Sequence, residues 1–384
     1  MRTRLTERFG VEFPLFAFSH CRDVVAAVTN AGGFGVLGAV AYSAERLDEE
    51  LTWIDAQVGG RPYGVDVLVP GKIDAAAAAP GARLPDLIPE AHRDFVDHLF
   101  RKYGVGAHNG PGEIGAAGAG SPGDADDVGR RVTHEGATRL IDVALKHPIG
   151  LIASALGPPP PEMVERARAA GVPVAALVGT VEHAARQVAA GVDIIVAQGA
   201  EAGGHTGEVS TMVLVPQVVD AVAPVPVLAA GGIADGRQVA AALALGAEGV
   251  WCGSVWLTTD EAETPPAVKR KMLAATSRDT VRSRSRTGKP ARQLRSAWTE
   301  EWDGAPDSPG PLGMPLQLLL AEEAMARVGR AAEAGVPGAR ELANYFVGQV
   351  VGQMNQVKPA RQVVYEMIEG YADAVERLRA VTDS

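Results

Sequence analysis

Cysteine is almost absent from this chain, and several other features that would define its class are also missing. Two cysteines, Cys21 and Cys252, occur among 384 residues and cannot form the disulfide framework of a small secreted protein. The first residues, MRTRLTERFG, lack the apolar stretch of a secretory signal peptide. No apolar run reaches the roughly 20 residues that a bilayer span needs. We therefore expect a cytoplasmic protein with no membrane partner.

Charge and metal-binding patterns exclude further classes. The formal net charge is -10, which argues against a general nucleic-acid partner. The sequence holds no CxxC, HExxH or paired-carboxylate pattern, so we expect no metal site. Aromatic residues make up only 5% of the chain, but hydrophobic residues as a whole make up 47%. This composition suits a large core in which small side chains pack helices tightly on a parallel sheet.

Eight apolar runs recur along the chain, with helical stretches between them. Each run is almost continuously apolar, as expected for a parallel strand that is buried on both faces. They occupy residues 13–18, 34–40, 63–69, 149–156, 172–178, 192–198, 225–231 and 248–254. Eight such βα units with right-handed crossovers predict an α/β fold of the closed (β/α)8 TIM-barrel type. An open doubly wound sheet is the alternative, although no GxGxxG turn follows the first strand to favour it.

Two regions interrupt this rhythm. Residues 71–130 form an insertion after the third strand, with a helical pattern over 89–103. Its Gly/Ala/Pro-rich run, 104–127, predicts either a tolerated, disordered surface loop or a lid over the active site. The second region follows residue 260 and carries three helical segments, 316–334, 338–353 and 360–381.

The domain organisation follows from these interruptions. We expect residues 1–260 to form the barrel, with the insertion emerging from it. Residues 261–384 should form a mostly helical subdomain packed on the barrel. Within the barrel, Thr180 and Asp235 are predicted to cap the helices that they precede.

The segment AQGAEAGGHTG, residues 197–207, carries the strongest functional signal. It follows a buried strand, so His205 is placed at a strand's carboxyl end, where parallel α/β proteins carry their chemistry. An imidazole there can exchange protons at neutral pH. Gly203 and Gly204 let the backbone approach a ligand closely. Glu201 could orient His205, contact the substrate or remain a solvated charge, and a structural histidine is the simpler alternative for His205.

Two glycine-rich turns follow the last two predicted strands. Gly231 and Gly232 lie in AAGGIADGR after the seventh strand, and Gly253 and Ser254 lie in WCGS at the end of the eighth. In TIM barrels the loops after these strands often bind a phosphate through backbone N–H groups and a helix N-terminus. The pair of turns therefore predicts a phosphate-bearing ligand.

Residues 278–295 reverse the sign of an acidic chain, with seven cationic side chains against one acid, Asp279. They either form a solvated or ion-paired surface, or attract an anionic substrate or cofactor phosphate. Arg292 is our candidate substrate residue in this run. His20 and Cys21 are adjacent on a predicted strand end and should point to opposite faces, which is unfavourable for a thiol–imidazole pair.

Taken in order, these motifs resemble the nitronate monooxygenase family, also called 2-nitropropane dioxygenase-like proteins. The matching segments are AAVTNAGGFGVLG (26–38), AQGAEAGGHTG, AAGGIADGRQVAAALALGAEGVWCGS (229–254) and TGKPAR (287–292). The resemblance implies an FMN-binding TIM barrel with a helical subdomain.

The resemblance also implies roles for individual residues. His205 would be the active-site base. The residues implied to bind FMN are Ala17, Phe18 and Ser19 beside the isoalloxazine ring, Gln198, Gly203 and Gly204 against the cofactor, Gly231, Gly232, Gly253 and Ser254 at its phosphate, and Asp66, which stands where the family often has Asn.

Three functions remain open at this point. The first is an FMN-dependent monooxygenase that oxidises small alkyl nitronates with O2 to a carbonyl compound and nitrite. The second is an NAD(P)H-dependent flavin reductase of an enoyl thioester, on CoA or an acyl-carrier protein, or of a quinone; the basic run suits a thioester substrate. The third is a flavin-binding protein without catalysis. The sequence leaves open whether the protein is a homodimer.

Overall fold

A closed barrel of eight parallel strands forms the centre of the molecule. The computed structural model describes residues 1–68, 84–106, 134–155 and 157–382, so residues 107–127 of the predicted lid or loop lie outside it. The strand order is β1-β2-β3-β4-β5-β6-β8-β9. The strands are β1 (Leu15–Ser19), β2 (Phe34–Gly38), β3 (Gly64–Val67), β4 (Leu151–Ser154), β5 (Val174–Val178), β6 (Ile194–Gln198), β8 (Val227–Ala230) and β9 (Gly249–Cys252). The predicted TIM barrel and its eight strands are confirmed.

Residues alternate along each strand between the barrel interior and the surrounding helices. Phe16, Phe34 and Trp251 lie inside, where the Phe16 and Phe34 ring centroids are 4.9 Å apart. Their strand neighbours, such as Leu15 and Val250, belong to the core between strands and helices. The same alternation points Phe18, Asp66 and Gln198 inward at the carboxyl ends of their strands.

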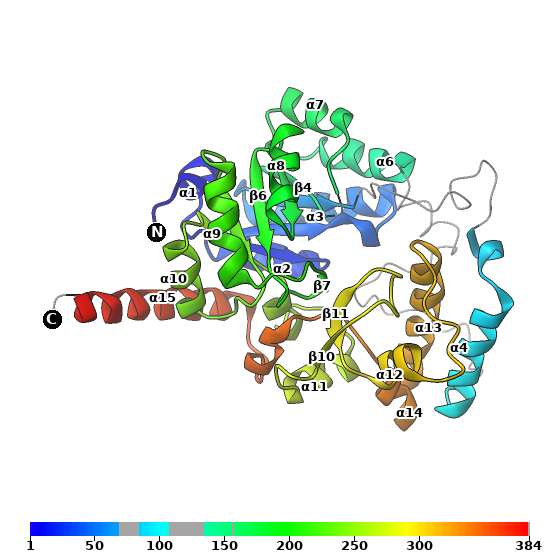
Figure 1. The fold of residues 1–384 in the computed structure, drawn as a ribbon. Helices are drawn as coiled ribbons and strands as arrows, with labels where there is room; N and C mark the ends of the chain where they lie inside the picture. Colours follow the sequence, from blue (N-terminus) through cyan, green and yellow to red (C-terminus); the bar gives the residue numbers. More distant parts are fainter. Residues whose placement is uncertain (69–83, 107–133, 156, 383–384) are drawn as a thin grey trace.

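Helices surround the barrel (Figure 1). After the short α1 (Arg4–Phe9), they are α2 (Arg22–Asn30), α3 (Ala44–Val58), α6 (His134–Ala144), α7 (Pro161–Ala169), α8 (Val181–Ala189), α9 (Thr211–Val222) and α10 (Gly236–Ala244). Both predicted caps are confirmed, since Thr180 accepts from His183 N at 3.2 Å and Asp235 forms a capping box with Gln238. No helix in the described part of the chain combines the length and the apolarity that a membrane crossing needs.

The late helix α15 (Ala360–Thr382) also belongs to the barrel. Its Val364 and Met367 lie in the same core as the barrel strands and the helices α2 and α10. Gly236 of α10 is in close contact with it, because an added Cβ there would lie 2.0 Å from the Tyr371 N. In Figure 1 this helix runs along the barrel and its far end extends beyond it.

A second hydrophobic core lies beside the barrel mouth. It is built from α4 (Glu90–Lys102), α11 (Pro266–Ala274), α12 (Ala297–Gly304), α13 (Leu316–Glu333) and α14 (Pro337–Leu342) around Trp298 and Trp302. Figure 1 shows α4, from the insertion, next to α13, more than two hundred residues later.

The helix predicted over 338–353 is wrong in its second half. It ends at Leu342, and only a 3-10 turn, Gln349–Gln353, follows. The segment 343–348 between these two elements packs against β11 and the barrel loop instead of continuing the helix. Leu294 N donates to Tyr345 O at 3.0 Å. Gly348 passes so close to the barrel loop that an added Cβ would lie 2.6 Å from Glu201 O. A continuous helix would not allow either approach.

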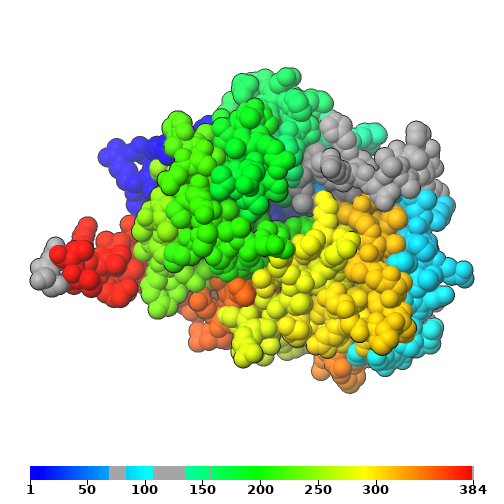
Figure 2. Space-filling view, in the orientation of Figure 1, coloured from blue at the N-terminus to red at the C-terminus, as the bar shows by residue number. Residues whose placement is uncertain are grey.

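A small antiparallel sheet connects this second core to the barrel, and the sequence did not predict it. Its order is β10 (Thr280–Ser283), β11 (Ala291–Leu294) and β7 (Gly204–His205). In Figure 2 the yellow segment that contains the hairpin lies directly against the green segment of the barrel. The basic run is therefore a β-hairpin at the barrel mouth, within a region predicted to be mostly helical.

Candidate active site

His205 lies in the two-residue strand β7, so the small sheet fixes its backbone. It is paired with Ala291 of β11. Its Nε2 lies 2.8 Å from Thr287 Oγ1, and its ring centroid lies 6.5 Å from that of Phe346. Thr287, not Glu201, orients the imidazole, which corrects the orienting role considered for Glu201.

The proton positions follow from the Thr287 hydroxyl, which has one hydrogen to give. Thr287 Oγ1 donates to Lys289 O at 3.2 Å, so we assign the His205 Nε2–H as donor to Thr287 Oγ1. Nδ1 then carries the lone pair. Burial, and after it the charge of Lys289, lowers the pKa of His205 to about 4. At neutral pH the imidazole is neutral and can accept a proton at Nδ1.

Glu201 and Arg292 hold the loop that carries His205. The Glu201 carboxylate accepts from Thr211 N at 2.9 Å and from Thr211 Oγ1 at 2.9 Å, so it caps α9. Arg292 donates from Nε to Ala200 O at 2.9 Å and from Nη1 to Thr280 Oγ1 at 3.1 Å. The structure gives both side chains positioning roles, and the substrate contacts considered for them stay predictions.

The two glycines before His205 differ in what surrounds them. A Cβ on Gly203 would lie 2.8 Å from Gly348 N, so this glycine allows the 343–348 segment to pack on the loop. Gly204 has a φ of +76°, which favours glycine, and a Cβ there would meet no atom within 4 Å. Open space for a ligand therefore borders Gly204, whereas Gly203 is occupied by protein contacts.

The other predicted cofactor residues divide by the direction of their side chains. Phe18 and Gln198 belong to the inward-facing positions at the mouth, and no hydrogen bond occupies the Gln198 amide within the described chain. Ala17 is fully buried on the helix-facing side of β1. Ser19 accepts from Cys21 N at 3.1 Å, which fixes the start of α2. Ala17 therefore cannot reach the mouth with its side chain.

The phosphate cradle predicted after the last two strands has unused donors. Within the described residues, the backbone N–H groups of Gly232, Ile233 and Gly253 donate to no other group. Gly348 N donates to Ser254 Oγ at 2.8 Å, which leaves the Ser254 hydroxyl proton for another acceptor. Free N–H groups at adjacent strand ends are a typical anion site. These residues therefore fit the phosphate of the expected cofactor.

Asp66 is a buried carboxyl with an unsatisfied oxygen. Its side chain is 4% exposed, and Oδ2 has no hydrogen-bond partner among the described residues. Burial raises its pKa to about 7. A buried polar atom without a partner at the barrel mouth is consistent with a ligand group that would complete it.

We expect Asp66→Asn to stabilise the flavin-free protein more strongly as the pH rises. The unfolded carboxyl loses its proton near pH 3.8, but the folded one keeps it until about pH 7. Folding stability therefore falls with increasing pH in this window, and asparagine removes the loss. The gain in unfolding free energy should be about 2–3 kcal/mol larger at pH 8 than at pH 5. Thermal melts of both proteins would measure it, with the exposed Asp97→Asn as control; equal gains at both pH values would contradict the assignment.

Two further residues at the site escaped the sequence analysis. Thr287 was noted only as part of the TGKPAR motif. His20 was considered only as a partner for Cys21, but it is held at the end of β1, with Nδ1 3.0 Å from Gly38 O. Its ring packs edge-on to Phe18, and a Cβ on Gly38 would lie 2.5 Å from it. Gly38 was the feature of the sequence that could have indicated His20, because a glycine leaves room for a bulky neighbouring side chain.

The basic run is mostly used inside the protein. Arg286 forms an ion pair with Glu322 at 2.6 Å, and Arg282 faces Glu208 at 3.5 Å. Arg282 and Arg284 also line an open groove of about 720 Å³ on the outer side of the hairpin, with Glu208 and Asp303. Arg286 therefore belongs to the ion-paired alternative for the basic run. Arg284 lines the groove and could still attract an anionic substrate or a cofactor phosphate.

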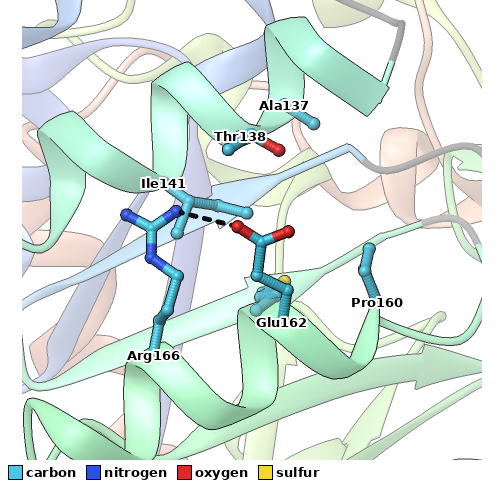
Figure 3. A pocket seen from close by; sticks show the side chains of 7 residues that line it. Ala137, Thr138, Ile141, Pro160, Glu162 and Arg166 are labelled. Atoms are coloured by element: carbon cyan, nitrogen blue, oxygen red, sulfur yellow. Dashed lines mark ion pairs between the residues drawn. The ribbon is translucent and has the colours of Figure 1, made fainter.

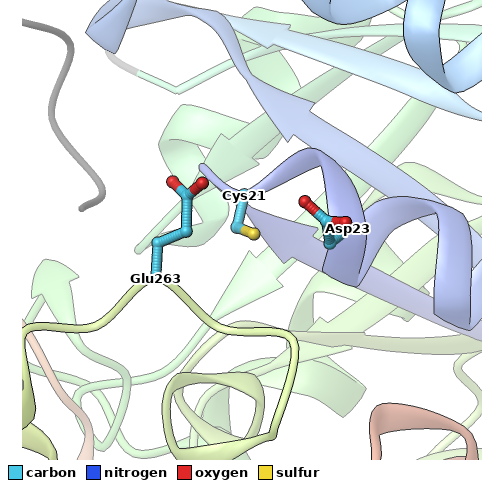
Figure 4. A group of neighbouring side chains, drawn as sticks. All are labelled: Cys21, Asp23 and Glu263. Atoms are coloured by element: carbon cyan, nitrogen blue, oxygen red, sulfur yellow. The ribbon is translucent and has the colours of Figure 1, made fainter. Parts of the chain in front are cut away.

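Two other places on the molecule bring polar side chains close together. Figure 3 shows a hollow between α6 and α7 where Arg166 faces Glu162 at 3.8 Å; its volume of about 10 Å³ is room for about one water. Figure 4 shows Cys21, Asp23 and Glu263, whose potential ligand atoms lie within 4.8 Å of one another. Burial raises the pKa of Cys21 to about 11, and its thiol donates to Glu261 O at 3.1 Å, so it is a protonated structural thiol.

Similarity to known proteins identifies the family of this chain. The sequence matches the family model described as nitronate monooxygenase over residues 2–370. It is 62% identical to the "Putative monooxygenase Rv1533" of Mycobacterium tuberculosis, with 99% of each chain covered. The fold is similar to that of a nitroalkane oxidase from Streptomyces ansochromogenes, with TM-score 0.77, 27% identity and coverage of 97% of this chain and 99% of that one.

A third similarity is to FabK from Thermotoga maritima, with TM-score 0.70, 26% identity and 99% of each chain covered. The family model matches residues 2–370, and this range includes the barrel, the His205 loop and the glycine-rich turns. The chain belongs to the nitronate monooxygenase family and is a flavin-dependent oxidoreductase.

Proposed function

We propose that this protein uses FMN to oxidise small alkyl nitronates with O2, giving a carbonyl compound and nitrite. The observation that carries the proposal is the set of free N–H groups after β8 and β9, which fit a flavin phosphate at the same barrel mouth as the neutral His205. A proton acceptor thus lies beside a place that fits a phosphate-bearing flavin. We favour FMN because the free N–H groups after β8 and β9, within the described residues, fit the single phosphate of this cofactor.

The proposed cofactor contacts follow from the free groups of the site. Gly232, Ile233 and Gly253 would donate backbone N–H groups to the phosphate, and the Ser254 hydroxyl would add a fourth donor. Gln198 and Asp66 would hold the ring system from the barrel interior. Bound FMN supplies the electron acceptor for the substrate and passes electrons to O2.

His205 would handle the substrate proton. Because its Nε2–H donates to Thr287, the imidazole keeps one orientation, with Nδ1 ready to take the α-proton of a neutral nitroalkane. A preformed nitronate has already lost this proton and does not need the base. Open space next to Gly204 would give the substrate access to this face of the loop.

The test is nitrite release and O2 uptake by the purified flavin-loaded protein with a small alkyl nitronate. We expect both, and we expect the nitrite formed to scale with the O2 consumed. A protein that retains its flavin yet shows neither would rule out this function. The reductase described next and the third function, a flavin-binding protein without catalysis, would then remain.

A second function, NAD(P)H-dependent reduction of an enoyl thioester or quinone, is favoured by the groove beside the hairpin. That groove, with Arg282 and the exposed Arg284 on its wall, could receive the phosphates of a CoA or acyl-carrier substrate. Adding NADH or NADPH under nitrogen separates the two functions. Rapid bleaching of the flavin by either would support the reductase, and its absence with both would exclude it.

A further inference from the structure

Lys289 differs from the other cations of the hairpin because its ammonium group has no partner in the part of the chain that the structure describes. Arg282 and Arg286 face carboxylates, and Arg292 donates to Ala200 O. Among the described residues, Lys289 forms no ion pair, and only its backbone takes part in hydrogen bonds. The side chain is nevertheless partly buried in the turn between β10 and β11. Burial of an unpaired cation is costly, so a group from outside the described chain would stabilise it.

The same short turn holds Lys289 next to His205. Lys289 N donates to Thr287 Oγ1 at 3.3 Å, and this hydroxyl donates back to Lys289 O at 3.2 Å. Thr287 Oγ1 is also the partner of His205 Nε2 at 2.8 Å. One hydroxyl therefore fixes both the imidazole and the backbone of the lysine. The two side chains are close enough for the charge of Lys289 to lower the pKa of His205.

Within the described ranges, the carboxylates around this turn are already paired. The Glu201 carboxylate accepts hydrogen bonds from the N–H and the hydroxyl of Thr211. Glu322 forms an ion pair with Arg286, and Glu208 forms one with Arg282. Burial also lowers the pKa of Lys289, as expected for a cation that lacks a counter-ion. An anion bound beside His205 would supply the missing negative charge.

We propose that Lys289 binds the negatively charged oxygens of the substrate and so makes the enzyme select small organic oxyanions over their neutral parent compounds. This inference rests on the proposed function, because a nitronate carries its negative charge on two oxygens. The neutral His205 offers that charge no counter-ion. Lys289 supplies the positive charge that binds the substrate oxygens, and His205 supplies the proton acceptor. The turn 287–289 therefore positions two groups with separate roles, one in substrate binding and one in proton transfer.

The kinetic test compares Lys289→Met with the wild-type holoenzyme. We expect the KM for a small alkyl nitronate to rise at least tenfold while kcat changes by less than about threefold, because the lost interaction belongs to binding. Lys289→Arg should restore most of the affinity. The exposed Arg278, at the start of the same basic run, gives a control of equal charge change in Arg278→Gln, whose KM should stay at the wild-type value.

A second measurement does not depend on turnover. Nitrate has the negative charge and the planar oxygens of a nitronate group without its reactivity, and calorimetric titration of the oxidised holoenzyme would give its Kd. We expect the Kd to rise at least tenfold in Lys289→Met and to stay unchanged in Arg278→Gln. Wild-type protein that binds no nitrate, or a Lys289→Met variant that binds it equally well, would overturn the inference even if nitronates are oxidised. Nitrate binding that depends on Lys289, in a protein that oxidises no nitronate, would overturn the proposed function and leave the anion site standing.

Discussion

Replacing His205 by glutamine is expected to lower kcat/KM for a neutral nitroalkane by about 10²–10⁴-fold, the usual contribution of a general base. The same variant should lose less than about tenfold with the preformed nitronate, because its α-proton has already left. The difference arises because burial holds the pKa of His205 at about 4, so the wild-type imidazole is neutral and acts on a proton, not on a charge. Initial rates with the two substrates, at equal flavin content, measure the ratio.

A matched variant tests whether the orientation of the ring matters as well as its presence. Thr287→Val removes the hydroxyl that accepts from His205 Nε2 at 2.8 Å but keeps the shape of the side chain. We expect an intermediate loss, again larger for the nitroalkane. Equal losses of His205→Gln on both substrates would show that His205 does not act as the base. Unchanged rates on both would remove it from the reaction.

Gly236→Ala is expected to produce a large loss of stability for the addition of a single methyl group. The new Cβ would lie 2.0 Å from Tyr371 N and 2.2 Å from Gly370 C, and both are backbone atoms of α15 that cannot move without the helix. Added atoms in a tight contact usually cost about 1–3 kcal/mol or more, which is roughly 1–4 °C or more in Tm for a chain this large. Thermal melting and proteolytic cleavage within α15 would both report the displacement.

Gly329→Ala is the control for this variant. Gly329 lies in α13, and an added Cβ there would meet no atom within 4 Å. The exchange should raise stability slightly, by up to about 1 kcal/mol, because alanine is the better helix former. A Gly236→Ala protein that melts like Gly329→Ala would mean that the α10–α15 contact does not hold the barrel together.

The barrel could be predicted because each of its strands is recognisable by itself. Runs such as IIVAQ and VLAA are apolar on both faces, and only a parallel strand between barrel interior and helices satisfies them. The small sheet could not be found in this way. Its strands TVRS and ARQL are short and polar, and β7 has two residues, so only pairing between distant segments makes them strands.

The candidate site shows the same division between local and distant information. The position of His205 at a strand's carboxyl end followed from the segment around it. Its partner Thr287 lies 82 residues later in the chain, and no local pattern connects the two. Glu201, four residues before the histidine, was the nearer candidate, but the N-terminus of α9 takes its carboxylate. Proximity in sequence was therefore misleading where a helix end competed for the same acceptor.

The place of α15 has a consequence for how the protein reaches its folded state. All eight barrel strands are synthesised before residue 253, but the surface of α2 and α10 that α15 covers stays bare for another hundred residues of translation. A nascent chain of that length holds a closed sheet whose outer layer still exposes apolar side chains to water. Such a surface attracts chaperones and other unfinished chains. Residues 360–382 must therefore be synthesised before the apolar surface of α2 and α10 is covered and protected from aggregation.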